Sequence, residues 1–192
     1  MSKTLDTLTF SMVAEGHGLH LADLQGIQAK MEALGCRCEL IALSSGEHSL
    51  DPLPAAYVLV LRKGVDALLS PIGLKLIDLF PEAYSDYINE LKGRMEALMG
   101  PKAKGLKVES NFDTTKCGIG DGERREVIGI RYSSMPMYWQ WYHKGEPLHE
   151  PIVVPMNPGD VYVMSEKAMG TDWKKMMIPT LRHATGCANI KE

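Results

Sequence analysis

The chain has no long apolar run and no large excess of one charge. No apolar segment approaches the roughly 20 residues that a membrane-spanning helix requires. The first residues, MSKTLDTLTF, contain neither the apolar core nor the cleavage site of a secretory signal. A formal net charge of −3 means that binding to nucleic acid would need a local basic patch. These absences predict a cytoplasmic protein, or one in another reducing intracellular compartment.

Cysteine is scarce, and its spacing matches no redox or zinc motif. The four cysteines are Cys36, Cys38, Cys117 and Cys187. Because Cys36 and Cys38 are two residues apart, they form neither a CxxC pair nor half of a zinc ribbon. We expect reduced thiols that pack as small apolar side chains.

The glycine motifs of common nucleotide-binding proteins are also missing. The octet CGIGDGER at 117–124 lacks the GK[ST] of a Walker loop and misses the GxGxxG spacing of a dinucleotide-binding turn. Taken alone, it predicts a glycine-rich hairpin turn.

The remaining composition is that of an ordinary globular protein. The 192 residues, 45% of them apolar and 23% charged, are enough for one well-filled core, so we predict a single domain over 1–192. Residues 1–104 predict an α/β segment. Its expected strands are 7–14, 37–44 and 56–64, and its expected helices are 19–34, 65–79 and 83–99. Residues 105–192 predict short strands separated by Gly and Pro, a pattern typical of a β-sandwich or small barrel.

Two potential metal ligands lie at opposite ends of the C-terminal β-rich stretch. Non-haem iron oxygenases bind iron with two histidines and one carboxylate on one face, which leaves three positions for cosubstrate and oxygen. Asp121 and His183 supply one residue of each type. The usual HxD pair places both ligands on the same side of a strand, but the residue two before Asp121 is Ile119, which has no lone pair to donate.

An aromatic segment, YWQWYH at 138–143, reads as a strand with two distinct faces. Alternation places Tyr138, Gln140 and Tyr142 on one face, and Trp139, Trp141 and His143 on the other. One face is expected to be core. The other face either lines a pocket that stacks a flat substrate or packs into the core as well. Tyr138 and Gln140 are therefore candidate substrate-binding residues.

Several segments together resemble a known family more than any one of them does. Residues 106–186 resemble the Fe(II)/2-oxoglutarate-dependent dioxygenases, in particular their AlkB-like branch. Asn111-Phe112 is similar to the N-x-Y element before the metal strand, and DGERREVIGIRYS to the D-x-E-R element with its apolar strand. PGDVYVMS is similar to the GD-x-x-x-M/W-S strand, and WKKMMIPTLRHATG to the run into the distal iron histidine. The resemblance implies a jelly-roll-like double-stranded β-helix in 105–192, supported by the α/β segment 1–104.

The resemblance also implies a reaction. Such enzymes bind Fe(II), 2-oxoglutarate and O₂, release succinate and CO₂, and oxidise a C–H bond, often in an N-methyl group of a nucleobase. It implies that Asp121 and His183 are metal ligands and catalytic residues, and that Glu123 lies near the substrate. It further implies that Asn111 and Tyr132 contact the cosubstrate. The basic partner of its far carboxylate would be Lys191, with Arg182 or Arg131 as alternatives.

The chain departs from this family at the metal site. Where the family reads roughly GIG-F-H-G-D-x-E-R, this sequence reads GIG-D-G-E-R, so the proximal histidine is missing. Loss of a ligand lowers metal affinity. Three hypotheses follow: a 2-oxoglutarate oxygenase that acts on a nucleobase, nucleotide or similar substrate, a catalytically impaired relative that binds nucleic acid or a protein, and an α/β scaffold with fortuitous matches.

Overall fold

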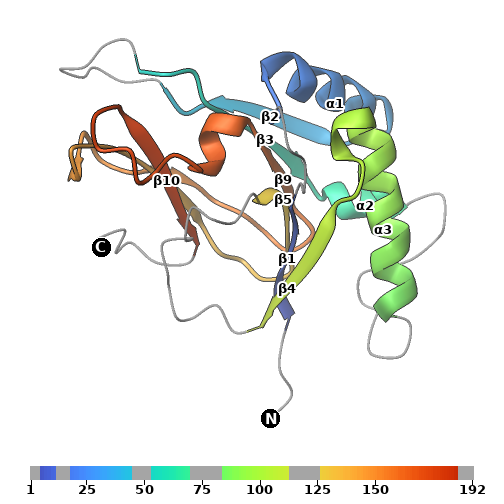
Figure 1. Ribbon diagram of the computed structural model, residues 1–192. Coiled ribbons are helices and arrows are strands. Elements are labelled where there is room, and N and C mark those ends of the chain that lie inside the picture. The colour runs from blue at the N-terminus through green and yellow to red at the C-terminus, as the bar shows by residue number, and fades with distance from the viewer. Residues whose placement is uncertain (1–4, 12–17, 45–52, 70–83, 113–125, 186–192) are drawn as a thin grey trace.

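Antiparallel strands dominate the computed structural model, which describes residues 5–11, 18–44, 53–69, 84–112 and 126–185 (Figure 1). The predicted mixed α/β class is confirmed. The α-helices are α1 (Leu21–Ala33), α2 (Gly64–Leu69) and α3 (Tyr84–Met99), and the short 3₁₀ helices are η3 (Gly100–Ala103) and η4 (Glu166–Met169). The strands are β1 (Leu5–Ser11), β2 (Arg37–Ala42), β3 (Tyr57–Arg62), β4 (Lys107–Phe112), β5 (Glu126–Arg131), β6 (Met137–His143), β7 (Glu146–Pro147), β8 (Ile152–Val154), β9 (Val161–Met164) and β10 (Thr180–Thr185).

The strands form two sheets, and the C-terminal strands alternate between them. The larger sheet has the order β2-β3-β9-β5-β1-β4, and the smaller has β10-β6-β7 with β8 also paired to β6. Along the chain, β5 lies in the larger sheet, β6 to β8 in the smaller, β9 in the larger again and β10 in the smaller. All the strand pairs among the described residues are antiparallel.

Strands from both predicted segments share the larger sheet. The N-terminal strand β1 lies between β5 and β4, and the hairpin of β2 and β3 extends the sheet beyond β9. The boundary expected near residue 104 therefore does not separate the strands of this sheet. Instead, residues 1–104 supply three of its six strands.

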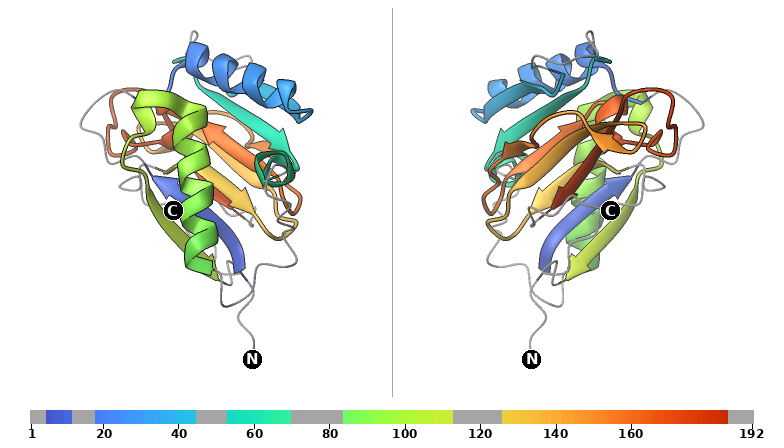
Figure 2. Two further views of the ribbon diagram at one scale, coloured as in Figure 1. Left: turned by 90° about the vertical axis from the view of Figure 1, so that its right-hand side faces the viewer. Right: turned by 90° about the vertical axis from the view of Figure 1, so that its left-hand side faces the viewer.

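Helices α1 and α3 cover the face of the larger sheet that points away from the smaller sheet (Figure 2). In α1, the buried side chains Leu24, Ile27 and Met31 recur at helical spacing and pack into the core. The Asp23 carboxylate accepts a hydrogen bond of 2.7 Å from the backbone N–H of His20 at the helix start. The helix ends before Gly35, whose φ of +81° favours glycine.

Strand β3 is buried on both faces because it lies between the helices and the smaller sheet. Its four central residues, Val58 to Leu61, are all fully buried, as the continuous apolar run in the sequence predicts. No helix in the described part of the chain is long and apolar enough to cross a membrane.

Candidate functional site

Strand alternation on β6 and β10 separates the aromatic segment into two faces, as predicted. Trp139 pairs with His183, and Met137 pairs with Thr185, so these four side chains share one face of the smaller sheet. Both Trp139 and Met137 are fully buried. This face is directed at the larger sheet, because Thr185 contacts Arg131 of β5. We call it the inner face.

His183, the predicted distal histidine, lies on the inner face. It is 8% exposed and stands directly opposite Trp139. The indole nitrogen of Trp139 is buried and has no hydrogen-bond partner among the described residues. A buried donor without a partner destabilises a fold by about 1–3 kcal/mol. A ligand that accepts a hydrogen bond from this N–H would recover part of that free energy.

Arg131 ends β5 and is buried between the two sheets, with 1% of its surface exposed. One terminal nitrogen donates a hydrogen bond of 2.6 Å to the hydroxyl of Thr185 and also contacts the sulfur of Met137. The guanidinium carbon lies 5.2 Å from the ring centre of Tyr162. Its Nε has no acceptor, and no carboxylate of the described residues pairs with it. Among the described residues, the positively charged guanidinium of Arg131 therefore contacts only neutral groups.

Gly129 allows the aromatic ring to lie beside this arginine. A Cβ atom at Gly129 would meet the ring of Tyr162 at 2.0 Å. Gly129 and Tyr162 are register partners on β5 and β9, and Arg131 is two residues further along the same face. A glycine within a strand often marks such a close approach.

Asn111 occupies the same cross-strand row as Arg131. Thr7 of β1 pairs with Asn111 on one side and with Arg131 on the other. Thr7 is itself buried at 3% exposure. Thr7 therefore lies between a predicted cosubstrate residue and the buried arginine in one cross-strand row of the larger sheet.

Other predicted site residues lie on the outer face of the smaller sheet, away from His183. Tyr138 packs against Tyr142 and Ala184 in a separate small cluster. The amide of Gln140 donates to the carbonyl oxygens of His149 and Trp141, so it anchors a neighbouring loop. The guanidinium of Arg182 lies 4.2 Å from the ring centre of Tyr142. The structure therefore does not bring these residues together with the predicted distal histidine.

The remaining predicted residues divide between described and undescribed parts. Tyr132 is half-buried and packs against the main core. Asp121, Glu123 and Lys191 lie outside the described residues. Within the described ranges, no three His, Cys, Asp or Glu side chains are grouped to hold a metal ion. Of the two predicted metal ligands, only His183 lies within the described residues.

The thiols near the start of β2 offer no reactive nucleophile. Cys36 is buried, and Cys38 is half-buried. Burial, with a smaller effect of the neighbouring Cys36, raises the pKa of Cys38 to about 12. A thiol that stays protonated at neutral pH reacts slowly.

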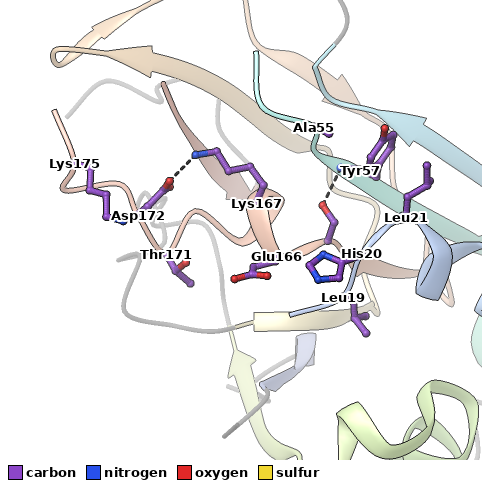
Figure 3. Close-up of a pocket in the computed structure, with 11 residues that line it drawn as sticks. Leu19, His20, Leu21, Ala55, Tyr57, Glu166, Lys167, Thr171, Asp172 and Lys175 are labelled. Atoms are coloured by element: carbon purple, nitrogen blue, oxygen red, sulfur yellow. Dashed lines mark hydrogen bonds and ion pairs between the residues drawn. The ribbon is translucent and has the colours of Figure 1, made fainter. Parts of the chain in front are cut away.

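A pocket of about 510 Å³ opens at the other end of the fold, where α1 begins and β9 ends (Figure 3). Its lining combines an apolar wall, which includes Leu21 and Tyr57, with the polar side chains of Glu166, Lys167 and Lys175. Sequence patterns did not predict this pocket, because its walls come from three distant segments.

A comparison with known proteins relates the chain to a viral sequence. It is 35% identical over 242 aligned positions to the "Uncharacterized protein R156" of Acanthamoeba polyphaga mimivirus, with 94% of this chain and 95% of the relative covered. The chain belongs to the family of this mimivirus protein. The aligned region is longer than the 192 residues of this chain, so the mimivirus relative contains segments that this chain lacks.

The alignment with the mimivirus relative covers almost the whole of both chains, so the aligned region includes the two sheets as well as the helices. No family model matches the chain. No solved structure matches it either.

Proposed function

We propose that this chain is an Fe(II)/2-oxoglutarate-dependent oxygenase of AlkB-like type that acts on a nucleobase or a similar substrate. The observation that carries the proposal is the buried Arg131, which contacts Thr185 and Met137 on the face of the smaller sheet that also holds His183 and Trp139.

The strand order supports a double-stranded β-helix. In that architecture, consecutive strands pass back and forth between two facing sheets. Here β5 pairs with β9 in one sheet, and β6 pairs with β10 in the other. The alternation begins at β5, which follows the DGER segment of the resemblance, and ends at β10, which contains His183.

A carboxylate is the ligand that matches the charge and the hydrogen-bond donors of Arg131. A buried ion without a partner is destabilising by several kcal/mol, and an anion that binds there recovers part of that free energy. The planar guanidinium donates two parallel hydrogen bonds to a carboxylate. One end of 2-oxoglutarate would therefore bind at Arg131, beside the hydroxyl of Thr185.

A second donor, the indole N–H of Trp139, lies on the same face of the smaller sheet as Thr185. Thr185, at the Arg131 end, and His183, opposite Trp139, are two residues apart on β10, which corresponds to roughly 6.6 Å. A five-carbon dicarboxylate, with about 5 Å between its terminal carbons, spans this separation through the oxygens at its two ends. Its other end would accept the unpaired N–H of Trp139.

The iron site is only partly represented in the described residues. His183 would supply an imidazole, and Asp121, outside the described ranges, would supply the carboxylate. Iron, when bound, would supply oxygen activation. Because the described residues contain no complete group of metal ligands, we derive from them the binding of the dicarboxylate and no step at the metal.

One observation favours a second function, that of a binding module. The sequence has Ile119 where the resembling family has its proximal histidine. A chain that retains Arg131 and Trp139 but lacks this ligand would bind the dicarboxylate without turning it over. It would then act as a binding module for nucleic acid or a protein partner.

The first experiment is an anaerobic titration of the purified protein with Fe(II) and 2-oxoglutarate. We expect a visible charge-transfer band from the chelate, because His183, Asp121 and the cosubstrate would share the metal. The band should be absent in His183→Ala and strongly weakened in Arg131→Met. Lys104→Gln, an exposed lysine in the turn after η3, serves as the matched control and should leave the band unchanged.

Calorimetric titration with 2-oxoglutarate alone separates the two functions. Binding that depends on Arg131, without any band in the presence of iron, would support the binding module and contradict the oxygenase. If the wild-type protein binds no 2-oxoglutarate with or without iron, both functions are wrong.

A further inference from the structure

The pocket beside the start of α1 is separate from Arg131 and His183. Neither of these residues lines it. Its walls come from the segment before α1, from the start of β3, and from η4 with the loop that follows it (Figure 3). A volume of about 510 Å³ lies within the range of roughly 300–1,000 Å³ that is common for small-molecule sites.

Backbone hydrogen bonds hold these walls together before any ligand binds. The N–H of Glu166 donates to the carbonyl oxygen of Leu19 at 2.9 Å, which ties η4 to the segment before α1. The hydroxyl of Ser165 accepts from the N–H of Tyr57 at 2.9 Å, and the N–H of Ser165 donates to the carbonyl of Tyr57 at 3.0 Å. The pocket is therefore preformed, which lowers the entropy lost on binding.

Gly18 allows η4 to approach this closely. A Cβ atom at Gly18 would lie 2.5 Å from the Cβ of Glu166, closer than two such atoms come. The absence of a side chain at Gly18 therefore allows Glu166 to lie against the segment before α1, and Figure 3 shows its carboxylate between Thr171 and His20.

The charged groups are arranged along one side of the pocket. Lys167 and Asp172 form an ion pair of 2.5 Å, and Lys167 also donates to the carbonyl oxygen of Pro179 at 2.9 Å. These two charges therefore neutralise each other and fix the loop. Lys175 and Glu166 are exposed and form no ion pair with another described residue. They remain available to a ligand.

The opposite side of the pocket is apolar and aromatic. Figure 3 shows Tyr57, Leu21 and Ala55 together at one end, with Lys175 at the other end and Glu166 between them. A matching ligand has a flat, partly apolar group at one end and an anionic group at the other. Between them it has hydroxyl groups that donate hydrogen bonds.

We infer that this pocket binds a nucleotide. The base would pack against Tyr57 and Leu21, because aromatic and aliphatic walls stabilise bases of any sequence. The Glu166 carboxylate would accept hydrogen bonds from the ribose hydroxyls, a role that acidic residues serve in dinucleotide sites. Lys175 would bind the phosphate as a point charge. The inference does not depend on the oxygenase reaction, because the pocket shares no lining residue with Arg131 and His183.

The role assigned to Glu166 predicts discrimination between ribose and deoxyribose. A carboxylate that accepts from the 2′-hydroxyl loses a charge-assisted hydrogen bond when that hydroxyl is removed. We therefore expect AMP to bind about 10-fold more tightly than 2′-deoxy-AMP, which corresponds to one such bond. Adenosine, which lacks the phosphate, should bind more weakly than AMP.

The test is calorimetric titration of the full chain with AMP, 2′-deoxy-AMP and adenosine. Glu166→Gln should reduce the preference for AMP over 2′-deoxy-AMP, because the amide oxygen that replaces the carboxylate accepts a neutral and weaker hydrogen bond. Lys175→Gln should weaken AMP and 2′-deoxy-AMP by the same factor and leave adenosine unchanged. The control variants Glu146→Gln and Lys104→Gln change exposed residues of the same types outside the pocket and should have no effect.

Three outcomes would overturn the inference. They are no binding of AMP by the wild-type chain, equal binding of AMP and 2′-deoxy-AMP, and AMP binding that Lys175→Gln leaves unchanged. Titration of the same samples with 2-oxoglutarate reports on the binding site proposed at Arg131, so the two proposals succeed or fail separately. Comparison of AMP with a short oligoadenylate shows whether the pocket takes a free nucleotide or one unit of a strand.

Discussion

Two arginines in this protein each lie against an aromatic ring, but in opposite surroundings. Arg131 lies 5.2 Å from the ring centre of Tyr162 and is 1% exposed on the inner side of the larger sheet. Arg182 lies 4.2 Å from Tyr142 and 5.6 Å from Trp173, and is half-buried on the outer face of the smaller sheet. In each of the two, Nε has no hydrogen-bond partner within the part of the chain that the structure describes.

The comparison shows that burial, more than the aromatic contact, determines whether the charge of an arginine needs an anionic partner. Water reaches part of the Arg182 side chain and solvates its charge, so a ring beside it is sufficient. Arg131 is shielded from water, and a ring, a hydroxyl and a thioether do not neutralise a full charge. The inner arginine therefore indicates a ligand, and the outer arginine indicates packing.

The largest difference between the two faces should appear when an aromatic residue is removed from each. Trp141→Ala on the inner face should lower the free energy of unfolding by about 3–5 kcal/mol, because the ring is fully buried. This change also removes the indole N–H that donates to the carbonyl of Leu43 at 2.6 Å. Tyr138→Ala on the outer face should have a smaller effect. Urea unfolding of both variants checks this, and equal losses would contradict the assignment of faces.

Arg131→Met should raise the free energy of unfolding of the ligand-free protein by about 1–4 kcal/mol. The reason is that it replaces an uncompensated buried charge with an apolar side chain of similar length. The same variant should lose all stabilisation by added 2-oxoglutarate. Thermal and urea unfolding with and without 2-oxoglutarate measure both effects. A clear loss of stability in the ligand-free variant would mean that the charge of Arg131 is already neutralised.

Gly129→Ala should lower the free energy of unfolding by about 1–3 kcal/mol through overpacking. The added methyl group would overlap the ring of Tyr162, which would have to move away from Arg131. Gly26→Ala in α1 is a suitable control, since nothing lies within 4 Å of its Cβ position. That control should raise stability slightly, because alanine favours helix. Equal behaviour of the two variants would rule out the close approach at Gly129.

Arg182→Met should have the smallest effect, a loss of about 0.5–1 kcal/mol, because it removes a partly solvated cation–π contact. It should leave 2-oxoglutarate binding unchanged. Calorimetry on this variant therefore tests the two arginines as alternatives for the far carboxylate. Loss of binding in Arg182→Met with retention in Arg131→Met would reverse the assignment.

Local patterns in the sequence predicted the strands and the faces of β6 well. Alternation in YWQWYH placed Trp139 and Trp141 on one face, and both are fully buried. The same reasoning did not single out Arg131 as the buried cation. Which side of β5 faces the smaller sheet depends on packing between sheets, and a single strand does not encode that packing.

The pocket beside α1 was not predicted for a related reason. Leu21, Tyr57 and Glu166 come from segments far apart in the chain. They meet because β3 pairs with β9, and because η4 is bound to the segment before α1. Hydrophobic periodicity reports on single elements, so it does not reveal sites that form where several elements end.

The position of β9 also has a consequence for how this protein is made. Strand β9 (Val161–Met164) lies between β3 and β5 in the larger sheet. In the sequence, however, β9 begins far after β3, which ends at Arg62. During synthesis the hairpin of β2 and β3 leaves the ribosome about 100 residues before its central partner, at about 5–20 residues per second. An apolar strand edge is thus exposed for seconds on the nascent chain, and unpaired edges of this kind promote aggregation. The yield of folded protein should depend on chaperones that bind this edge until β9 emerges.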